Sequence, residues 1–184
     1  MTHAHASPAG YGVVAKALHW TIVGLLFCQF AIAWTMPDIG PRTTQPDRLI
    51  DLHLSFGTLI LLVIVVRLLW RIGHPVPLLT DNVPRWQQIA AKAGHHTLYL
   101  LLVIMPLLGW ASASGRGFPV TLFGLMRLPD ILSRRSPLTG VLGDVHTVLS
   151  YVLLGVVGLH VLAALSHHFV LRDDTLRRML PGIR

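Results

Sequence analysis

Long apolar stretches, separated by short polar segments, dominate the sequence. No Asp, Glu, Lys or Arg occurs within residues 17–37, 52–66, 93–115 and 145–171. A bilayer core requires about 20 residues of helix, so three of these stretches qualify directly. The second is short, but Arg67 and Arg71 can extend their side chains to the interface. We therefore predict an all-α, integral membrane four-helix bundle forming one domain over residues 1–184, with spans at about 15–36, 50–70, 93–113 and 144–169.

The two ends of the chain carry weaker signals. Lys16, an apolar run and the small residues "AIA" at 31–33 imitate a cleaved signal peptide, but the run is long for one and contains His19 and Trp20. We therefore interpret it as a retained span. After the fourth span, "RDDTLRRMLP" predicts a short interfacial helix at about residues 173–180, which would anchor the chain on the membrane surface.

Composition supports a membrane protein and limits its chemistry. The chain is 53% hydrophobic and 12% charged, with a mean hydropathy of +0.61. Its net charge of +7 is spread over helix ends and loops, which favours lipid headgroups over nucleic acid as the partner. Cys28 is the only cysteine, so the chain cannot form an internal disulfide, a cysteine-ligated cluster or a covalently attached c-type haem.

Basic residues predict the orientation. With both termini inside, nine Lys and Arg lie on the cytoplasmic side and six on the outer side, as the positive-inside rule favours. The nine inner residues are Lys16, Arg67, Arg71, Arg85, Lys92, Arg172, Arg177, Arg178 and Arg184, and the six outer ones are Arg42, Arg48, Arg116, Arg127, Arg134 and Arg135. The outer loop at 115–140 has four arginines against one Asp. It could attract a small anion or lie on lipid headgroups.

Histidines within the apolar spans are the candidate functional residues. His146, His160 and His167 lie near one face of the fourth span, and the first two are separated by about 21 Å along a helix. His53 begins the second span at the depth of His146, and His19 can reach the depth of His160. Ionisable residues inside a membrane are costly and usually face a partner in the bundle. This pattern predicts two pairs, His53 with His146 and His19 with His160.

Two such pairs suit two b-type haems, because each b haem takes two neutral imidazoles from facing helices. Glycines near the histidines either leave room for porphyrin or allow helices to pack closely; they are Gly24, Gly57, Gly155 and Gly158. Two alternatives remain open. The histidines could serve packing alone, or they could line a metal or proton pathway, although the spans contain no Asp or Glu to complete a relay.

Several segments in order resemble the bacterial cytochrome b561 family, across nearly the whole chain. They are "ALHW" at 17–20, "HLSFG" at 53–57, "VVRLLWRIGHPVP" at 65–77, "HHTLYLLLVIMPLLGW" at 95–110, "DVH" at 144–146, "GLHVLAALSHHF" at 158–169 and "RDDTLRRMLP" at 172–181. The resemblance implies a bacterial inner-membrane protein with haem iron bound by the same two histidine pairs. It further implies an oxidoreductase similar to superoxide oxidase, which passes electrons from superoxide at the outer face to ubiquinone.

The remaining inner-side residues suggest a quinone pocket. His95, His167 and Lys92 are candidate contacts for ubiquinone or haem propionates, with Tyr99 and Arg71 beside them, because an imidazole can donate protons to a reduced quinone. His95 is also the rival of His19 as an inner haem ligand. The roles of His96 and His168 stay open.

Two other functions remain in competition with this one. The first is a cytochrome b anchor subunit that passes electrons between a partner dehydrogenase or hydrogenase and the quinone pool. The second is a histidine-lined transporter without redox activity.

Overall fold

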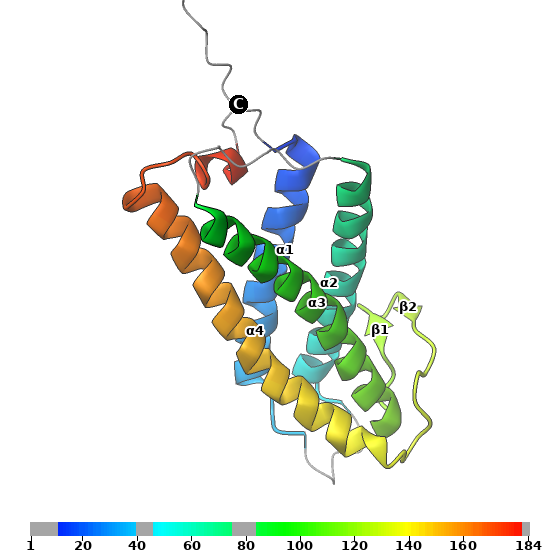
Figure 1. Cartoon of the computed structure of the whole chain (residues 1–184). Helices are drawn as coiled ribbons and strands as arrows, with labels where there is room; N and C mark the ends of the chain where they lie inside the picture. Colours follow the sequence, from blue (N-terminus) through cyan, green and yellow to red (C-terminus); the bar gives the residue numbers. More distant parts are fainter. Residues whose placement is uncertain (1–10, 40–45, 75–83, 182–184) are drawn as a thin grey trace, which may run out of the picture.

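Four long helices and one small hairpin make up the described chain (Figure 1). The computed structural model describes residues 11–39, 46–74 and 84–181. Its elements are α1 (Val13–Thr35), α2 (Arg48–Gly73), α3 (Arg85–Arg116), β1 (Thr121–Leu122), β2 (Met126–Arg127), α4 (Leu138–Phe169) and the 3-10 helix η1 (Arg177–Met179). All four α-helices are long and apolar enough to cross a membrane. The predicted all-α four-helix membrane bundle is confirmed.

Two helices extend well beyond the predicted spans. Helices α3 and α4 each contain 32 residues, or about 48 Å of helix, against a hydrocarbon thickness of about 30 Å. The extra turns of α3 include Arg85, Lys92 and Arg116, and α4 gains residues 138–143. Hydropathy marks the part of a helix that lies in lipid, so it could not locate ends that continue into the polar layer.

Local capping explains where some helices begin and end. The Asp47 carboxylate accepts a hydrogen bond from the Leu49 N–H at 3.2 Å and caps the start of α2. Helix α3 ends at Gly117, whose φ of 81° is in the left-handed region that glycine tolerates. There the N–H groups of Gly117 and Phe118 donate to the carbonyls of Ser114 and Ala113. Phe118, only 1% exposed, then turns the chain back against the bundle.

The helices pack in two pairs. The largest interfaces are those between α1 and α2 and between α3 and α4. A smaller interface between α2 and α3 links the two pairs. An apolar core lies at the centre of the bundle, formed by Ile22, Ile60, Ile64, Leu101, Leu102, Met105 and Leu153. Only 6% of an apolar 18-residue stretch of α1, and the same share of one in α4, is buried. These two helices therefore present most of their apolar surface outward, as lipid contact requires.

The two ends of the bundle differ. The loop end, which we define by the end of α1, the start of α2, the end of α3 and the start of α4, carries the α3–α4 connection. In that connection β1 and β2 pair in antiparallel register, Thr121 with Arg127 and Leu122 with Met126. A small second core of Ile50, Ala113, Phe118 and Val120 fixes the connection to α2 and α3. The terminal end is the opposite end, where α1 starts and α4 finishes.

At the terminal end the predicted interfacial helix at 173–180 is replaced by the shorter 3-10 helix η1. Helix α4 ends at Phe169, and Arg172 soon after it has a positive φ of 54°, which a right-handed helix does not contain. The segment then crosses to the start of α1, where Lys16 Nζ donates to the Leu180 carbonyl at 3.0 Å and Trp20 Nε1 to the Met179 carbonyl at 2.8 Å. These side chains bond the carbonyls of Leu180 and Met179, which would otherwise accept backbone hydrogen bonds if the helix were longer.

Candidate functional site

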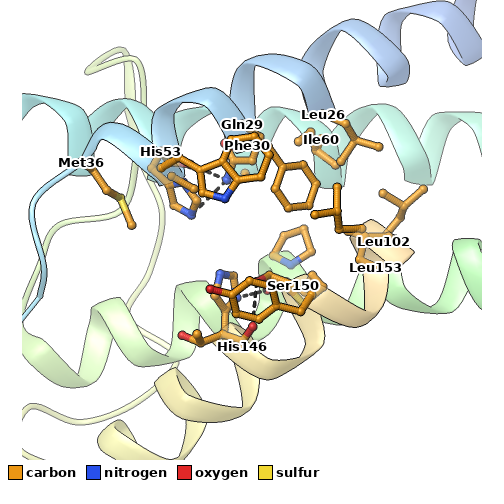
Figure 2. A pocket seen from close by; sticks show the side chains of 18 residues that line it. Leu26, Gln29, Phe30, Met36, His53, Ile60, Leu102, His146, Ser150 and Leu153 are labelled. Carbon is orange, nitrogen blue, oxygen red and sulfur yellow. Dashed lines mark hydrogen bonds between the residues drawn. The ribbon is translucent and has the colours of Figure 1, made fainter. Parts of the chain in front are cut away.

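A pair of histidines faces each other across a cavity near the loop end. His53 on α2 and His146 on α4 have ring centroids 6.1 Å apart, with the rings inclined by 78°. The cavity beside them measures about 190 Å³ and is lined by residues from all four helices, including Gln29 and Ser150. Figure 2 shows His53 and Gln29 on one wall, and His146 and Ser150 on the opposite wall. We call this the loop-end site.

The His146 ring is held by α3. Its Nδ1 lies 3.0 Å from the backbone carbonyl oxygen of Met105. A carbonyl can only accept, so Nδ1 carries the proton and Nε2 keeps its lone pair. Gly109 allows this close approach, since a Cβ there would lie 3.1 Å from His146 Cε1. The sequence thus sets both the position and the tautomer of a potential ligand.

The His53 ring is contacted by Gln29 on α1. The Gln29 amide nitrogen lies 3.1 Å from His53 Nε2 and donates to the His53 carbonyl at 3.2 Å. The Gln29 Oε1 and His53 Nδ1 atoms are buried without a hydrogen-bond partner. Each such atom costs about 1–3 kcal/mol. Polar groups left unsatisfied beside an open cavity are typical of a binding site.

Three histidines meet towards the terminal end, in what we call the terminal-end site. The His160 ring on α4 lies 6.4 Å from the His19 ring on α1 and 5.4 Å from the His95 ring on α3, measured between centroids. Nearby, Arg67 donates to the Ala15 carbonyl at 2.8 Å and ties α2 to the first turn of α1. The structure therefore brings together both the predicted pair and its rival.

The geometry of the pairs fits a group that binds two imidazoles. A metal ion about 2 Å from the nitrogen of each of two opposed imidazoles places the ring centroids roughly 6 Å apart. The separations of 6.1 Å for His53 and His146 and 6.4 Å for His19 and His160 match this value. The 5.4 Å separation of His95 and His160 is shorter.

The glycines distinguish between the two explanations offered for them. A Cβ added at Gly24, Gly155 or Gly158 would have no neighbouring atom within 4 Å. One added at Gly57 would meet only the Gln29 amide, at 3.5 Å. None of these glycines is required for close contact between helices. Gly57 lines the cavity beside His53, where this space suits a large planar group, whereas Gly24, Gly155 and Gly158 are exposed on the outside of the bundle.

The other predicted contacts are dispersed. Lys92 is exposed on α3, and its backbone carbonyl lies 2.7 Å from the Nδ1 of His96, which is also exposed. His167 bonds the Asp173 carboxylate across the end of α4. Arg71 and Tyr99, both named as possible members of the predicted quinone pocket, are bonded to each other, with Arg71 donating to the phenol oxygen at 2.9 Å. Of the predicted quinone contacts, His95 is the one that reaches a haem-ligand candidate.

Close by, at the terminal end, Tyr11 adds a second phenol. Burial raises its pKa, although Arg71 acts in the opposite direction. Tyr11 therefore stays protonated near neutral pH and can donate a hydrogen bond.

Three neighbours of the loop-end site were not identified from the sequence. Gln29 was detectable, because it is the one amide side chain within the apolar stretch of α1. Gly109 and Arg116 carried no such signal, since their roles depend on how α3 faces α4. A Cβ added at Gly143 would lie 3.8 Å from Arg116 Nη2. The Arg116 guanidinium is therefore beside α4 about one turn before His146.

A membrane helix bundle with opposed intramembrane histidines defines the class of membrane-embedded b-type cytochromes. Comparison with known proteins gives the family. Residues 10–182 match the family model described as prokaryotic cytochrome b561, and the chain belongs to that family, whose members bind haem b. Membership accords with electron transport and oxidoreductase activity.

Individual relatives extend over almost the whole chain. The chain is 32% identical to cytochrome b561 homolog 2 of Escherichia coli K12 over 174 residues, covering 95% of this chain and 93% of the relative. It is 33% identical to the probable superoxide oxidase CybB of Yersinia pestis over 177 residues, covering 95% and 97%. Identity to cytochrome b561 homolog 1 of Escherichia coli K12 is 27% over 168 residues, covering 89% and 93%.

Proposed function

We propose that this protein is a di-haem cytochrome of the bacterial inner membrane that oxidises superoxide and reduces ubiquinone. His53 and His146 would hold one haem b, and His19 and His160 the other. The observation that carries the proposal is the loop-end pair, whose centroid separation of 6.1 Å would let both imidazoles hold one haem. The similarity to a probable superoxide oxidase supports the choice of donor.

The chain's own groups would prepare the ligands. The hydrogen bond from His146 Nδ1–H to the Met105 carbonyl leaves the Nε2 lone pair free to bind iron. This hydrogen bond also makes Nε2 more basic, so that it would bind iron more strongly. When bound, the haems supply iron that accepts and releases one electron at a time. Since His146 and His160 are about 21 Å apart along α4, the two sites divide the bilayer between them.

The electron balance fixes the stoichiometry. Each superoxide loses one electron and becomes dioxygen, whereas ubiquinone gains two electrons and two protons to become ubiquinol. Two superoxide anions are therefore consumed for each ubiquinol formed. The protein must admit an anion at one face and supply protons at its quinone site.

We place the donor at the loop end, facing the periplasm, with both termini in the cytoplasm. The α3–α4 connection provides Arg116, Arg127, Arg134 and Arg135, and a positive potential there raises the local concentration of a small anion. Arg116 is the best placed of the four, because it lies beside Gly143 and His146 follows one turn later on the same helix face.

We place ubiquinone near the terminal end. His95 lies beside His160, and the Arg71–Tyr99 pair and Tyr11 add hydrogen-bond donors at the same end. An imidazole can deliver the protons that a reduced quinone needs. Lys92 and His167 remain candidates for a second proton route or for contacts with haem propionates.

Haem quantification and a coupled assay on the purified chain test this function. We expect two b haems per chain and reduction of one ubiquinone for every two superoxide anions consumed. His146→Ala should remove one haem, whereas His96→Ala, at an exposed histidine of α3, should retain both. Activity only with a copurified subunit would support an anchor cytochrome instead, and a colourless protein would support a transporter.

A further inference from the structure

The β1–β2 hairpin lies against the side of α2 rather than above the bundle. Ser55 on α2 bridges the two, since its hydroxyl donates to the Thr121 carbonyl at 3.0 Å and accepts from the Phe123 N–H at 3.1 Å. The rings of Phe56 and Phe123 add an edge contact at 5.4 Å. Figure 1 shows the hairpin level with one half of α2, between the two ends of the bundle.

This position corresponds to hydrocarbon depth. Ser55 precedes Arg71 by about 24 Å of helix, whereas the hydrocarbon is about 30 Å thick. With the exposed Arg71 at the interface of the terminal end, Ser55 lies several ångströms inside the apolar layer near the loop end. The hairpin tip bonded to Ser55 must then lie at a similar depth.

The side chains of the tip are apolar and exposed. Leu125 is 87% exposed, Met126 53% and Phe123 43%. They continue the outward apolar surface of α2, which includes the exposed Leu62. At the base of the hairpin the polarity changes, where Arg127 pairs with Asp130 at 3.7 Å. An apolar tip above a charged base is the pattern expected of a segment that enters a membrane from its surface.

Three backbone N–H groups of the tip also have internal partners, which lowers the cost of placing them in an apolar solvent. The Phe123 N–H bonds Ser55, the Gly124 N–H bonds Thr121 Oγ1 at 3.2 Å, and the Leu125 N–H bonds the Leu122 carbonyl at 3.0 Å. A hairpin tip surrounded by water would not need each of these donors satisfied.

We propose that the tip of this hairpin, residues 123–126, inserts into the bilayer and contacts the acyl chains of the leaflet at the loop end. Ser55 is two residues beyond His53, so the hairpin holds the face of α2 opposite the loop-end site. Insertion would thus fix the rotation of α2 in the membrane while His53 faces the cavity. The lipid contact is distinct from the haem and quinone chemistry.

Site-directed spin labelling of the haem-loaded protein in phosphatidylcholine vesicles tests insertion. In a Cys28→Ser background, one label is placed at Leu125→Cys, a lipid-facing reference at Leu62→Cys, and an aqueous reference at Ser133→Cys in the same connection. Leu62 and Ser133 are both exposed in the structure. The measurement is collision of each label with dioxygen, which concentrates in lipid, and with a water-soluble nickel chelate. Unchanged haem spectra show that each variant is folded, and Met126→Cys replaces Leu125→Cys if the latter fails to fold.

We expect the label at Leu125 to behave like that at Leu62, with high dioxygen and low nickel accessibility. Nickel accessibility equal to that at Ser133 would overturn the proposal and leave the tip in water, free to dock a protein. Low accessibility to both reagents would also overturn it, because the tip would then be covered by a second copy of the chain.

Discussion

His146 Nδ1 on α4 bonds the carbonyl of Met105 on α3 at 3.0 Å, so one helix sets the ligand chemistry of another. Pro106 follows Met105 inside α3. Proline has no N–H, so the intrahelical bond that residue 106 would have donated to the Leu102 carbonyl, one turn earlier, is missing. Helix α3 thus contributes no ligand to the loop-end site, yet it determines which His146 nitrogen is available.

The first prediction concerns Gly109, which makes room for the His146 ring. A Cβ at Gly109 would lie 3.1 Å from Cε1 and 3.3 Å from Nδ1 of His146. Gly109→Val should displace the ring, break its bond to Met105 and weaken haem retention at the loop-end site roughly 10-fold. Haem loss to apomyoglobin measures retention. Gly94→Val, on the same helix with no neighbouring atom within 4 Å, is the matched control. Equal retention in both variants would contradict the assigned role.

Gln29 should influence the reduction potential of the loop-end haem. Its amide contacts the His53 ring, so Gln29→Glu places a carboxylate beside a ligand of the ferric ion. Negative charge stabilises the ferric state, and we expect the midpoint potential to fall by about 60 mV, equivalent to about 1.4 kcal/mol for a one-electron couple. Redox titration measures the shift. Gln87→Glu, near the start of α3, should leave this potential unchanged, and a fall of both haem potentials in Gln29→Glu would argue against a local effect.

The sequence predicted the helices and the two histidine pairs for a physical reason. Exclusion of charge from lipid is a local property of the chain, and the depth of His53 and His146 follows from counting residues along helices. The orientation of one helix against another is not local. Neither the Met105–His146 bond nor the placement of Arg116 beside α4 could be predicted, because each depends on side-chain packing between α3 and α4. The hairpin was also missed, because its position depends on how the α3–α4 connection packs against Ser55 on α2.

The rival ligands at the terminal-end site can be separated by substitution. If His19 and His160 are the axial pair, His19→Ala and His160→Ala should each reduce the haem content from two to one. His95→Ala should then keep both haems and lower the rate of ubiquinone reduction, because His95 lies beside His160 at the proposed quinone site. Pyridine haemochrome assays and low-temperature spectra measure the haem content. Two haems in His19→Ala and one in His95→Ala would reverse the assignment.

The C-terminal segment should open in acid through Asp173. Burial acts to raise the pKa of this carboxyl, but hydrogen bonds from His167 and Thr175 outweigh burial and leave the pKa below the usual value of 3.8. A carboxyl with a depressed folded-state pKa stabilises the fold above its unfolded pKa, and this stabilisation is lost as the pH falls through the folded value. The protection factor of the Thr175 amide, which donates to Asp173 at 2.8 Å, should therefore fall several-fold below pH 3.8.

Asp173→Ala is the variant for that experiment. The Thr175 amide should show low protection at every pH in this variant, because the bonds from Thr175 and from His167 to the Asp173 carboxylate cannot form. The amide of Met36, which bonds the Ile32 carbonyl at the far end of the bundle, provides an internal reference that should not titrate. Protection of Thr175 that stays constant through the acid range in the unsubstituted chain would show that the carboxylate does not hold this segment.

The last prediction tests whether Arg116 attracts the anionic donor. Its guanidinium lies beside Gly143, one turn from His146, where the loop-end haem would be exposed to superoxide. Arg116→Ala should lower the second-order rate constant for superoxide about 10-fold at low ionic strength. Added salt should make the rate constants of the variant and the unsubstituted protein equal, because screening removes the attraction that Arg116 provides. Arg85→Ala removes an equal charge at the terminal end and should have little effect. Reduction of the haems by a neutral quinol should proceed at the same rate in all three proteins, which distinguishes attraction of the anion from damage to the haem site. A rate deficit in Arg116→Ala that persists in high salt, or that extends to the neutral donor, would assign Arg116 a structural role instead.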